Sequence, residues 1–205
     1  MNFTRIDHLT LGEHYHLADD DECYFLREYT ARQGFEASDT NGIVLNLKKP
    51  MDRRGRPEWP YKEKAIKQAA AEIRMALTPE WLRAATLVPV PPHRNKSDPL
   101  YDDRITQMAT LISGDVRELV VQVATLTPSH GSDSRPTPGE LRNNYRLDEA
   151  LCMPTPTAIG VLDDMLTAGA HFRAIKDMLV ERFPGVPVVG IFYARRILPA
   201  TPLPP

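Results

Sequence analysis

The feature that most constrains the fold is an apolar run that leads directly into an acidic pair, a short loop and a helix. Residues 158–162 read Ala-Ile-Gly-Val-Leu, and two aspartates follow at 163–164. The next residues, 165–169, include threonine and glycine and predict a turn. Apolar spacing then predicts a helix over 170–182. A buried strand that turns into a helix is typical of the βαβ units of parallel sheets.

The same alternation continues along the chain. Apolar and β-branched runs predict further strands at residues 43–47, 84–90, 119–124 and 186–193. Helical spacing predicts helices at 61–77 and 101–112. Together these segments predict an α/β fold with a central, mostly parallel sheet flanked by helices and joined by right-handed crossovers. The polar stretch 127–146 is predicted to be a long functional loop.

The length of 205 residues suits one α/β domain with a small appendage. We expect residues 1–38, which are polar and weakly patterned, to form an N-terminal extension. Residues 39–198 are predicted to form the α/β domain. Residues 199–205 are rich in proline, and we expect a flexible tail there.

The loop after the acidic pair has the features of a phosphate site. A turn from the carboxyl end of a strand into a helix presents unbonded amides, and the helix dipole favours an anion there. The predicted phosphate-binding loop consists of Met165, Leu166, Thr167, Ala168 and Gly169. Thr167 adds a hydroxyl donor, and Gly169 allows the main chain to approach a ligand closely.

Asp163 and Asp164 suit a different part of the same ligand. Carboxylates repel a phosphate, but they accept hydrogen bonds from sugar hydroxyls. We therefore predict that the pair binds a ribose diol, one sugar length from the phosphate. Both residues are candidate catalytic residues.

The pattern Asp163-Asp164-x-x-Thr167-x-Gly169 resembles the phosphoribosyl pyrophosphate motif of type I phosphoribosyltransferases. In that family the acidic pair holds the ribose 2′ and 3′ hydroxyls, and the loop holds the 5-phosphate. Ala168 stands where the family often has a second threonine. The resemblance implies a type I phosphoribosyltransferase-like fold with a flexible hood loop over the site, to which the N-terminal extension of residues 1–38 contributes.

A basic loop follows the strand predicted at 84–90 and resembles the pyrophosphate-binding loop of the ComF-like, amidophosphoribosyltransferase-like group. Its candidate residues are Pro92, His93, Arg94 and Lys96. Pyrophosphate requires cationic donors, which the last three supply. Alone, the loop has the composition of an ordinary solvated turn. Its place ahead of the acidic pair favours the pyrophosphate role.

Two further segments resemble the ComF-like group more weakly. Arg104 and Gln107 match a stretch that opens the following helix. The polar stretch resembles the hood: Arg135 is a candidate catalytic residue, and Arg142 and Asn143 are candidate hood residues. The alternative for this stretch is a surface loop without function. The zinc-binding cysteine segment of many ComF-like proteins is missing from the sequence.

The resemblance implies transfer of a phosphoribosyl group to a small nitrogenous acceptor, with release of pyrophosphate. Mg²⁺ is the implied cofactor, and no direct metal ligand is assigned: the ion would be held through the ligand, with Asp163 and Asp164 as the protein groups nearest to it. The family also leaves a homodimer open. One alternative is a phosphoribosyl-ligand sensor without catalysis. Another is a DNA-uptake accessory that binds single-stranded DNA through the basic residues 53–56.

The composition gives weaker predictions. The net charge of −2 argues against a nucleic-acid partner outside that last alternative. No apolar run approaches the ~18 residues that predict a membrane span, and the N-terminus has no apolar leader. The two cysteines form no disulfide or zinc pattern, so we expect a cytoplasmic protein. His8, His14 and His16 are interpreted as surface residues and not as metal ligands.

Overall fold

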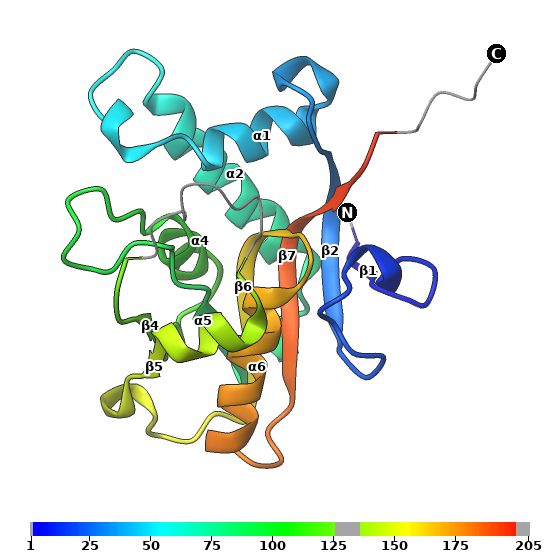
Figure 1. Cartoon of the computed structure of the whole chain (residues 1–205), viewed down its shortest axis with the longest axis vertical. Coiled ribbons are helices and arrows are strands. Elements are labelled where there is room, and N and C mark those ends of the chain that lie inside the picture. The colour runs from blue at the N-terminus through cyan, green and yellow to red at the C-terminus, as the bar shows by residue number, and fades with distance from the viewer. Residues whose placement is uncertain (1, 126–135, 200–205) are drawn as a thin grey trace.

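The computed structural model describes residues 2–125 and 136–199 and contains a five-stranded sheet (Figure 1). The strand order is β1-β2-β7-β6-β3. The first strand is antiparallel to its neighbour, and the other pairs are parallel. The strands are β1 (Thr4–Arg5), β2 (Cys23–Thr30), β3 (Ala85–Pro89), β6 (Ala158–Leu166) and β7 (Val188–Ile197). The predicted α/β class with a mostly parallel sheet is confirmed.

Helices flank the sheet, as predicted, and a small second sheet lies beside it (Figure 1). The α-helices are α1 (Asp39–Leu47), α2 (Pro60–Ala76), α3 (Pro79–Ala84), α4 (Arg104–Ile112), α5 (Pro138–Asn144) and α6 (Ala170–Arg182). Short 3-10 helices are η1 (Leu11–Glu13), η2 (Phe35–Ala37), η3 (Met51–Arg53) and η4 (Glu149–Leu151). The second sheet pairs β4 (Val120–Gln122) with β5 (Tyr145–Leu147) in antiparallel fashion.

The core divides into two clusters, one on each face of the sheet. Phe172 and Ile175 of α6 pack with Val161 of β6 in one cluster. Ile73 of α2 packs with Leu162 of β6 in the other. Neighbouring residues of β6 thus enter opposite clusters, because successive side chains of a strand point to opposite faces. This explains why the strand is an unbroken apolar run in the sequence.

The strand predicted at residues 43–47 is wrong: these residues form the second half of α1. The side chain of Ser38 accepts a hydrogen bond from the Asn41 amide and starts the helix. Asn41 then anchors α1 to β2, because its side chain bonds both the amide and the carbonyl of Thr30. An apolar run of five residues cannot by itself distinguish a buried helix from a strand.

Three other predicted segments differ in detail. The run at 119–124 is a strand, β4, but it belongs to the small sheet and not to the central one. The stretch predicted as loop up to residue 146 contains α5, which begins with a capping box of Thr137 and Glu140. The strand predicted to end at residue 162 continues to Leu166, so the acidic pair and the first two predicted loop residues lie inside β6.

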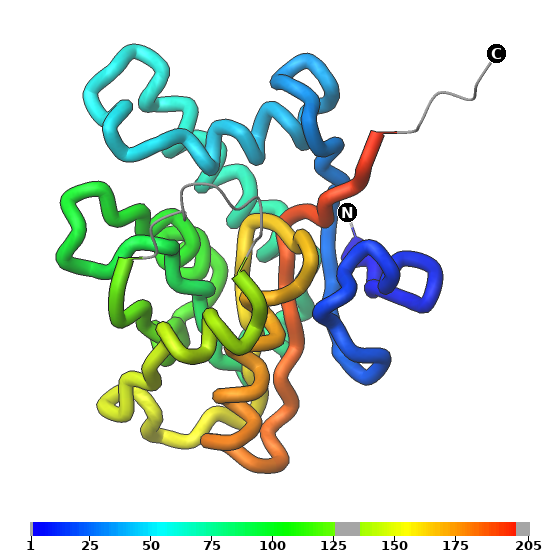
Figure 2. The backbone as a smooth tube through the Cα atoms, viewed as in Figure 1, coloured from blue at the N-terminus to red at the C-terminus, as the bar shows by residue number. Residues whose placement is uncertain are grey.

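The first 38 residues contribute two strands, which the sequence did not predict. The eight residues of β2 run parallel to β7 in a register from Cys23–Gly190 to Thr30–Ile197. Figure 2 shows these two segments, from opposite ends of the chain, side by side. Cys23 and Phe25 are buried, but the charged residues Arg27 and Glu28 follow and obscure the alternation.

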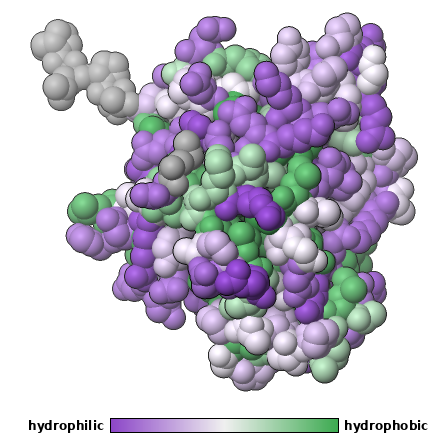
Figure 3. Space-filling view, turned by 180° about the vertical axis from the view of Figure 1, so that it is seen from behind, coloured by the Kyte–Doolittle hydropathy of each residue, from purple (hydrophilic) through white to green (hydrophobic). Residues whose placement is uncertain are grey.

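Hydrophilic side chains cover most of the back of the molecule, and hydrophobic atoms show between them near the middle (Figure 3). Over residues 2–125 and 136–199, no helix has the length and apolar character needed to cross a membrane.

Candidate functional site

Asp163 and Asp164 line a hollow of about 190 Å³ at the carboxyl end of β6. The Asp164 amide donates to Oδ1 of Asp163 at 2.8 Å, which holds the Asp163 carboxylate against the main chain. Crevices at the carboxyl ends of parallel strands are the usual ligand positions in such sheets. The lining side chains come from several separate segments: Lys48, Val90, Pro91, Pro92, His93, Arg104, Ile105, Asp163, Asp164, Met165, Thr167 and His171.

Asp164 is a buried carboxylate held by two cations. Its exposed fraction is 2%. Nε and Nη2 of Arg104 each lie 2.8 Å from Oδ2, and Nζ of Lys48 lies 3.3 Å from Oδ1. Burial alone would raise the pKa of Asp164, but Arg104 and Lys48 outweigh it and hold the pKa below its ordinary value. Asp164 is therefore ionised at neutral pH.

Asp163 is shifted in the opposite direction. Burial and the neighbouring charge of Asp164 raise the pKa of Asp163, and Lys48 and Arg104 offset this only in part. Two adjacent carboxylates whose pKa values are driven apart are a common property of functional sites. The pair thus combines a fixed anion with a group that takes up a proton more readily than an ordinary aspartate.

The loop Thr167–Gly169 is shaped by the N-terminal segment. Nδ1 of His14 donates to the Thr167 carbonyl, and the His16 amide donates to the Ala168 carbonyl at 2.9 Å. In a trans peptide the N–H points opposite to the preceding C=O, so the amides of Ala168 and Gly169 point away from that segment. Within the described residues, no acceptor is bonded to these two amides or to the Thr167 hydroxyl.

Gly169 is required by the backbone. Its φ is +90°, in the left-handed region, and a Cβ added there would lie 2.7 Å from Cδ2 of Leu17. Immediately after it, α6 begins with unbonded first-turn amides. The same contacts correct the interpretation of His14 as a surface residue: it is fully buried, and burial lowers the pKa of its ring.

The predicted pyrophosphate loop is split between two places. Pro92 and His93 line the hollow beside the acidic pair. Arg94 instead pairs with Asp98 at 2.7 Å. Lys96 pairs with Glu118 at 2.6 Å. The two strong cations of this loop are thus engaged elsewhere.

The predicted hood residues do not gather at the acidic pair. Arg142 of α5 pairs with Glu181 at 2.5 Å, near the end of α6. Glu181 lies about 16 Å along the helix from the residue that follows the phosphate loop. Asn143 is exposed on α5. Arg135 lies outside the described residues.

The structure adds three residues that the sequence did not single out: Lys48, Tyr145 and His171. His171 lines the hollow, and its Nδ1 lies 2.6 Å from the hydroxyl of Tyr145 in β5. Burial, with a smaller contribution from Lys48, lowers the pKa of His171 to about 4, so the ring is neutral at pH 7. His171 follows Gly169 in sequence, and a polar residue in the first turn after such a loop was the available signal. Lys48 carried none, because it directly follows the run predicted as a strand and opens an ordinary basic stretch of the sequence.

A metal site built from protein groups alone does not form here. Among the described residues, no cluster of three or more His, Cys, Asp or Glu side chains could hold a metal ion. The two carboxylates suit an ion that is held mainly by ligand oxygens and water, as Mg²⁺ often is.

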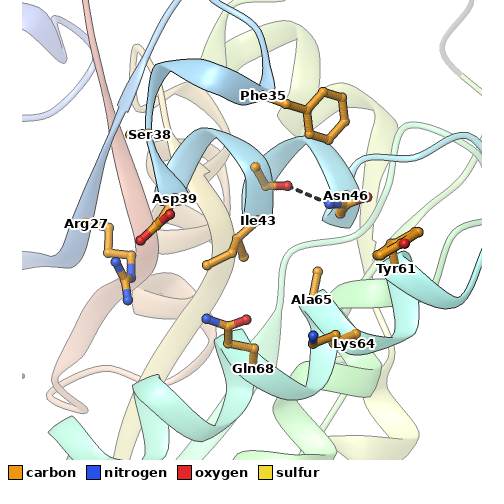
Figure 4. A pocket seen from close by; sticks show the side chains of 11 residues that line it. Arg27, Phe35, Ser38, Asp39, Ile43, Asn46, Tyr61, Lys64, Ala65 and Gln68 are labelled. Atoms are coloured by element: carbon orange, nitrogen blue, oxygen red, sulfur yellow. Dashed lines mark hydrogen bonds between the residues drawn. The ribbon is translucent and has the colours of Figure 1, made fainter. Parts of the chain in front are cut away.

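A second, larger hollow of about 380 Å³ lies between α1 and α2 (Figure 4). Phe35 and Tyr61 flank it, and Arg27 of β2 lies at its side. Arg27 already bonds Glu72 through Nε at 2.8 Å and Nη2 at 3.0 Å. Its wall includes Gly42, whose carbonyl accepts from the Asn46 side chain. The residues predicted from the sequence as site residues do not line it.

Comparison with known proteins adds no family to this description. The chain matches no protein-family model, and a search of the curated proteins finds no match.

Proposed function

We propose that the protein binds phosphoribosyl pyrophosphate and transfers its phosphoribosyl group to a small nitrogenous acceptor, in a type I phosphoribosyltransferase-like site. The observation that carries the proposal is one hollow that joins the Asp163–Asp164 pair to a loop with unbonded amides within the described chain. Thr167 and His171, on either side of Ala168 and Gly169, both line that hollow.

Each part of the ligand has a matching group. The ionised Asp164 and its neighbour accept from the ribose 2′ and 3′ hydroxyls. The 5-phosphate receives the Thr167 hydroxyl, the amides of Ala168 and Gly169 and the positive end of the α6 dipole. This arrangement separates the negative carboxylates from the negative phosphate by the length of the sugar.

The pyrophosphate group of the ligand would be bound by cations that do not belong to the predicted basic loop. Lys48 and Arg104 lie within the hollow with His93, whereas Arg94 and Lys96 have partners outside it. Mg²⁺, held by ligand oxygens and water, would neutralise further charge.

In the reaction, the acceptor nitrogen forms a bond to ribose C1 as the bond from C1 to the pyrophosphate oxygen breaks. The electron pair leaves with pyrophosphate, and the sugar develops positive charge. The chain contributes by gripping both ends of the ligand and by placing carboxylates near the cationic sugar.

A sensor without catalysis is the second candidate. Pro91 and Pro92 line the hollow, and prolines have no backbone N–H to offer a pyrophosphate. Pyrophosphate release in the presence of nitrogenous acceptors distinguishes the two functions, because a sensor binds the ligand and releases none.

The direct test is calorimetric titration of the whole protein with phosphoribosyl pyrophosphate and Mg²⁺. We expect binding by the wild type and its loss in the Asp163→Asn/Asp164→Asn double variant. Asp177→Asn is the matched control, because Asp177 lies on α6, pairs with Arg173 at 3.0 Å and does not line the hollow. A wild type that does not bind the ligand would refute the proposal.

A further inference from the structure

The carboxylate best placed for the ribose is already occupied by the protein's own cations. Arg104 makes two contacts to Oδ2 of Asp164 at 2.8 Å, and Lys48 approaches Oδ1 at 3.3 Å. Asp164 is 2% exposed, so water does little to replace these partners. A ligand can bind to the Asp164 carboxylate or to the two cations only by replacing their contacts with each other.

Lys48 is held in place by a buried lysine. Lys62 of α2 is 2% exposed, and its Nζ donates to the carbonyls of Leu47 at 2.6 Å and Lys49 at 3.0 Å. These carbonyls belong to the residues on either side of Lys48. Lys62 therefore clamps the main chain from which the Lys48 side chain reaches Asp164.

Arg104 is tied to the same lysine through Asp102. Oδ2 of Asp102 accepts from Lys62 at 2.8 Å and from Nη1 of Arg104 at 2.9 Å. The contacts close into a ring: Lys48, Asp164, Arg104, Asp102, Lys62 and the main chain of Lys48. Within the ring, Asp164 is the anion that faces the hollow, and Lys48 and Arg104 are the cations that face it.

Buried ionic rings of this kind rarely increase net stability, because desolvation of the charges offsets their attraction. Removing one member, however, leaves the others buried and unpaired, which is costly. A ligand that draws Lys48 and Arg104 away must therefore also compensate Asp164.

We propose that Asp164 is an internal counter-ion that makes the site select ligands carrying a vicinal diol and a multivalent anion together. The diol hydroxyls donate hydrogen bonds to the carboxylate of Asp164, while Lys48 and Arg104 transfer to the anion. This inference rests on the proposed function, since it concerns the same hollow. An anion without the diol strips the cations from a buried carboxylate and binds weakly.

The test uses inorganic pyrophosphate as the probe, titrated calorimetrically without Mg²⁺ into the wild type and into Asp164→Asn. Asparagine keeps the shape of the side chain but releases both cations. We expect pyrophosphate to bind Asp164→Asn at least about tenfold more tightly than the wild type, equivalent to about 1.4 kcal/mol. Phosphoribosyl pyrophosphate should bind the same variant more weakly than the wild type.

A gain of affinity separates this role from a merely structural one, because a damaged site loses all ligands. The double variant Lys48→Met/Asp164→Asn should bind pyrophosphate no more tightly than the wild type, because one of the released cations is removed. The control Asp177→Asn should also bind it with wild-type affinity. Unchanged or weaker pyrophosphate binding by folded Asp164→Asn would overturn the inference. If that variant does not fold, Asp102→Asn serves instead, since it frees Arg104 from one carboxylate. Pyrophosphate should bind Asp102→Asn about threefold more tightly than the wild type, and unchanged affinity would overturn the inference.

Failure of the proposed function gives a different result. If the wild type does not bind phosphoribosyl pyrophosphate but Asp164→Asn gains pyrophosphate affinity, the counter-ion role stands and the assignment of the ligand is wrong. If the wild type binds phosphoribosyl pyrophosphate and no variant gains pyrophosphate affinity, the function stands and the counter-ion role is wrong.

Discussion

The two hollows beside α1 differ in how their charged groups are paired and buried. The one between α1 and α2 measures about 380 Å³, and the one at the end of β6 about 190 Å³. The larger is walled mainly by α1 and α2, and its charged residues are Arg27, Asp39 and Lys64, of which Arg27 is paired with Glu72. The smaller contains one buried and one half-buried carboxylate, whose pKa values are driven apart. Concentrated, competing charge is a better indication of function here than volume.

The most direct test of which hollow binds the ligand is to substitute residues in each hollow in turn. Asp163→Asn/Asp164→Asn should weaken binding of phosphoribosyl pyrophosphate at least about 100-fold, since it replaces both carboxylates with neutral amides, each with one acceptor oxygen fewer for the diol. Gly42→Leu should change it less than about twofold, because the new side chain fills only the other hollow. A Cβ at Gly42 meets nothing closer than 3.9 Å, so the helix tolerates it. Calorimetry measures both, and the reverse order of effects would locate the ligand between α1 and α2.

A glycine from each region sharpens the contrast in stability. Gly169→Ala should lower the free energy of unfolding by about 1–3 kcal/mol, because alanine is strained at φ +90° and meets Leu17. Gly42→Ala lies inside a helix with open space around it, and should raise that free energy by up to about 1 kcal/mol. Denaturant unfolding of both variants measures the difference. Equal effects would mean that the loop is not held as described.

The raised pKa of Asp163 gives a pH dependence with a defined sign. The folded protein holds this proton to a higher pH than the unfolded chain, whose aspartates ionise near pH 4. Stability therefore falls as pH rises from about 4 through the folded pKa. Asp163→Asn removes this loss, so its stability relative to the wild type should increase between pH 5 and pH 8, by about 1 kcal/mol or more. Unfolding curves at the two pH values test it, and a constant difference would contradict the shift.

The smallest expected effect concerns the pair at the edge of the smaller hollow. Tyr145→Phe keeps the ring but removes the hydroxyl that bonds Nδ1 of His171. We expect a loss of about 1 kcal/mol in the free energy of unfolding and a change of less than about threefold in ligand affinity. A large loss of affinity would place Tyr145 in direct contact with the ligand.

The sequence predicted those parts of the fold that depend on neighbouring residues. The helix predicted over 170–182 has the same bounds as α6. Its apolar spacing begins directly after Gly169, and a glycine at that point indicates a turn. The run 43–47 was assigned to a strand because its helical start depends on the Ser38 cap and on the Asn41 anchor to β2. Such tertiary anchors leave no periodic trace in the sequence.

The candidate site shows the same limit. Asp163, Asp164 and the loop to Gly169 could be proposed from one continuous segment. Lys48 and Arg104 reach Asp164 from distant elements, and Arg94 and Lys96 find partners that no local pattern indicates. The charge of a residue is visible in the sequence, whereas its partner is decided by the fold.

The contacts of His14, His16 and Leu17 with the loop Thr167–Gly169 also bear on the order in which the chain folds. His14 and Thr167 are 153 positions apart, so the loop is held by a segment synthesised long before it. Closing a contact across so many residues costs loop entropy, so we expect it to form after the local helices and turns. Binding competence should therefore be among the last properties a refolding molecule regains. A truncation or bulky fusion near residue 14 should impair it while most of the sheet remains intact.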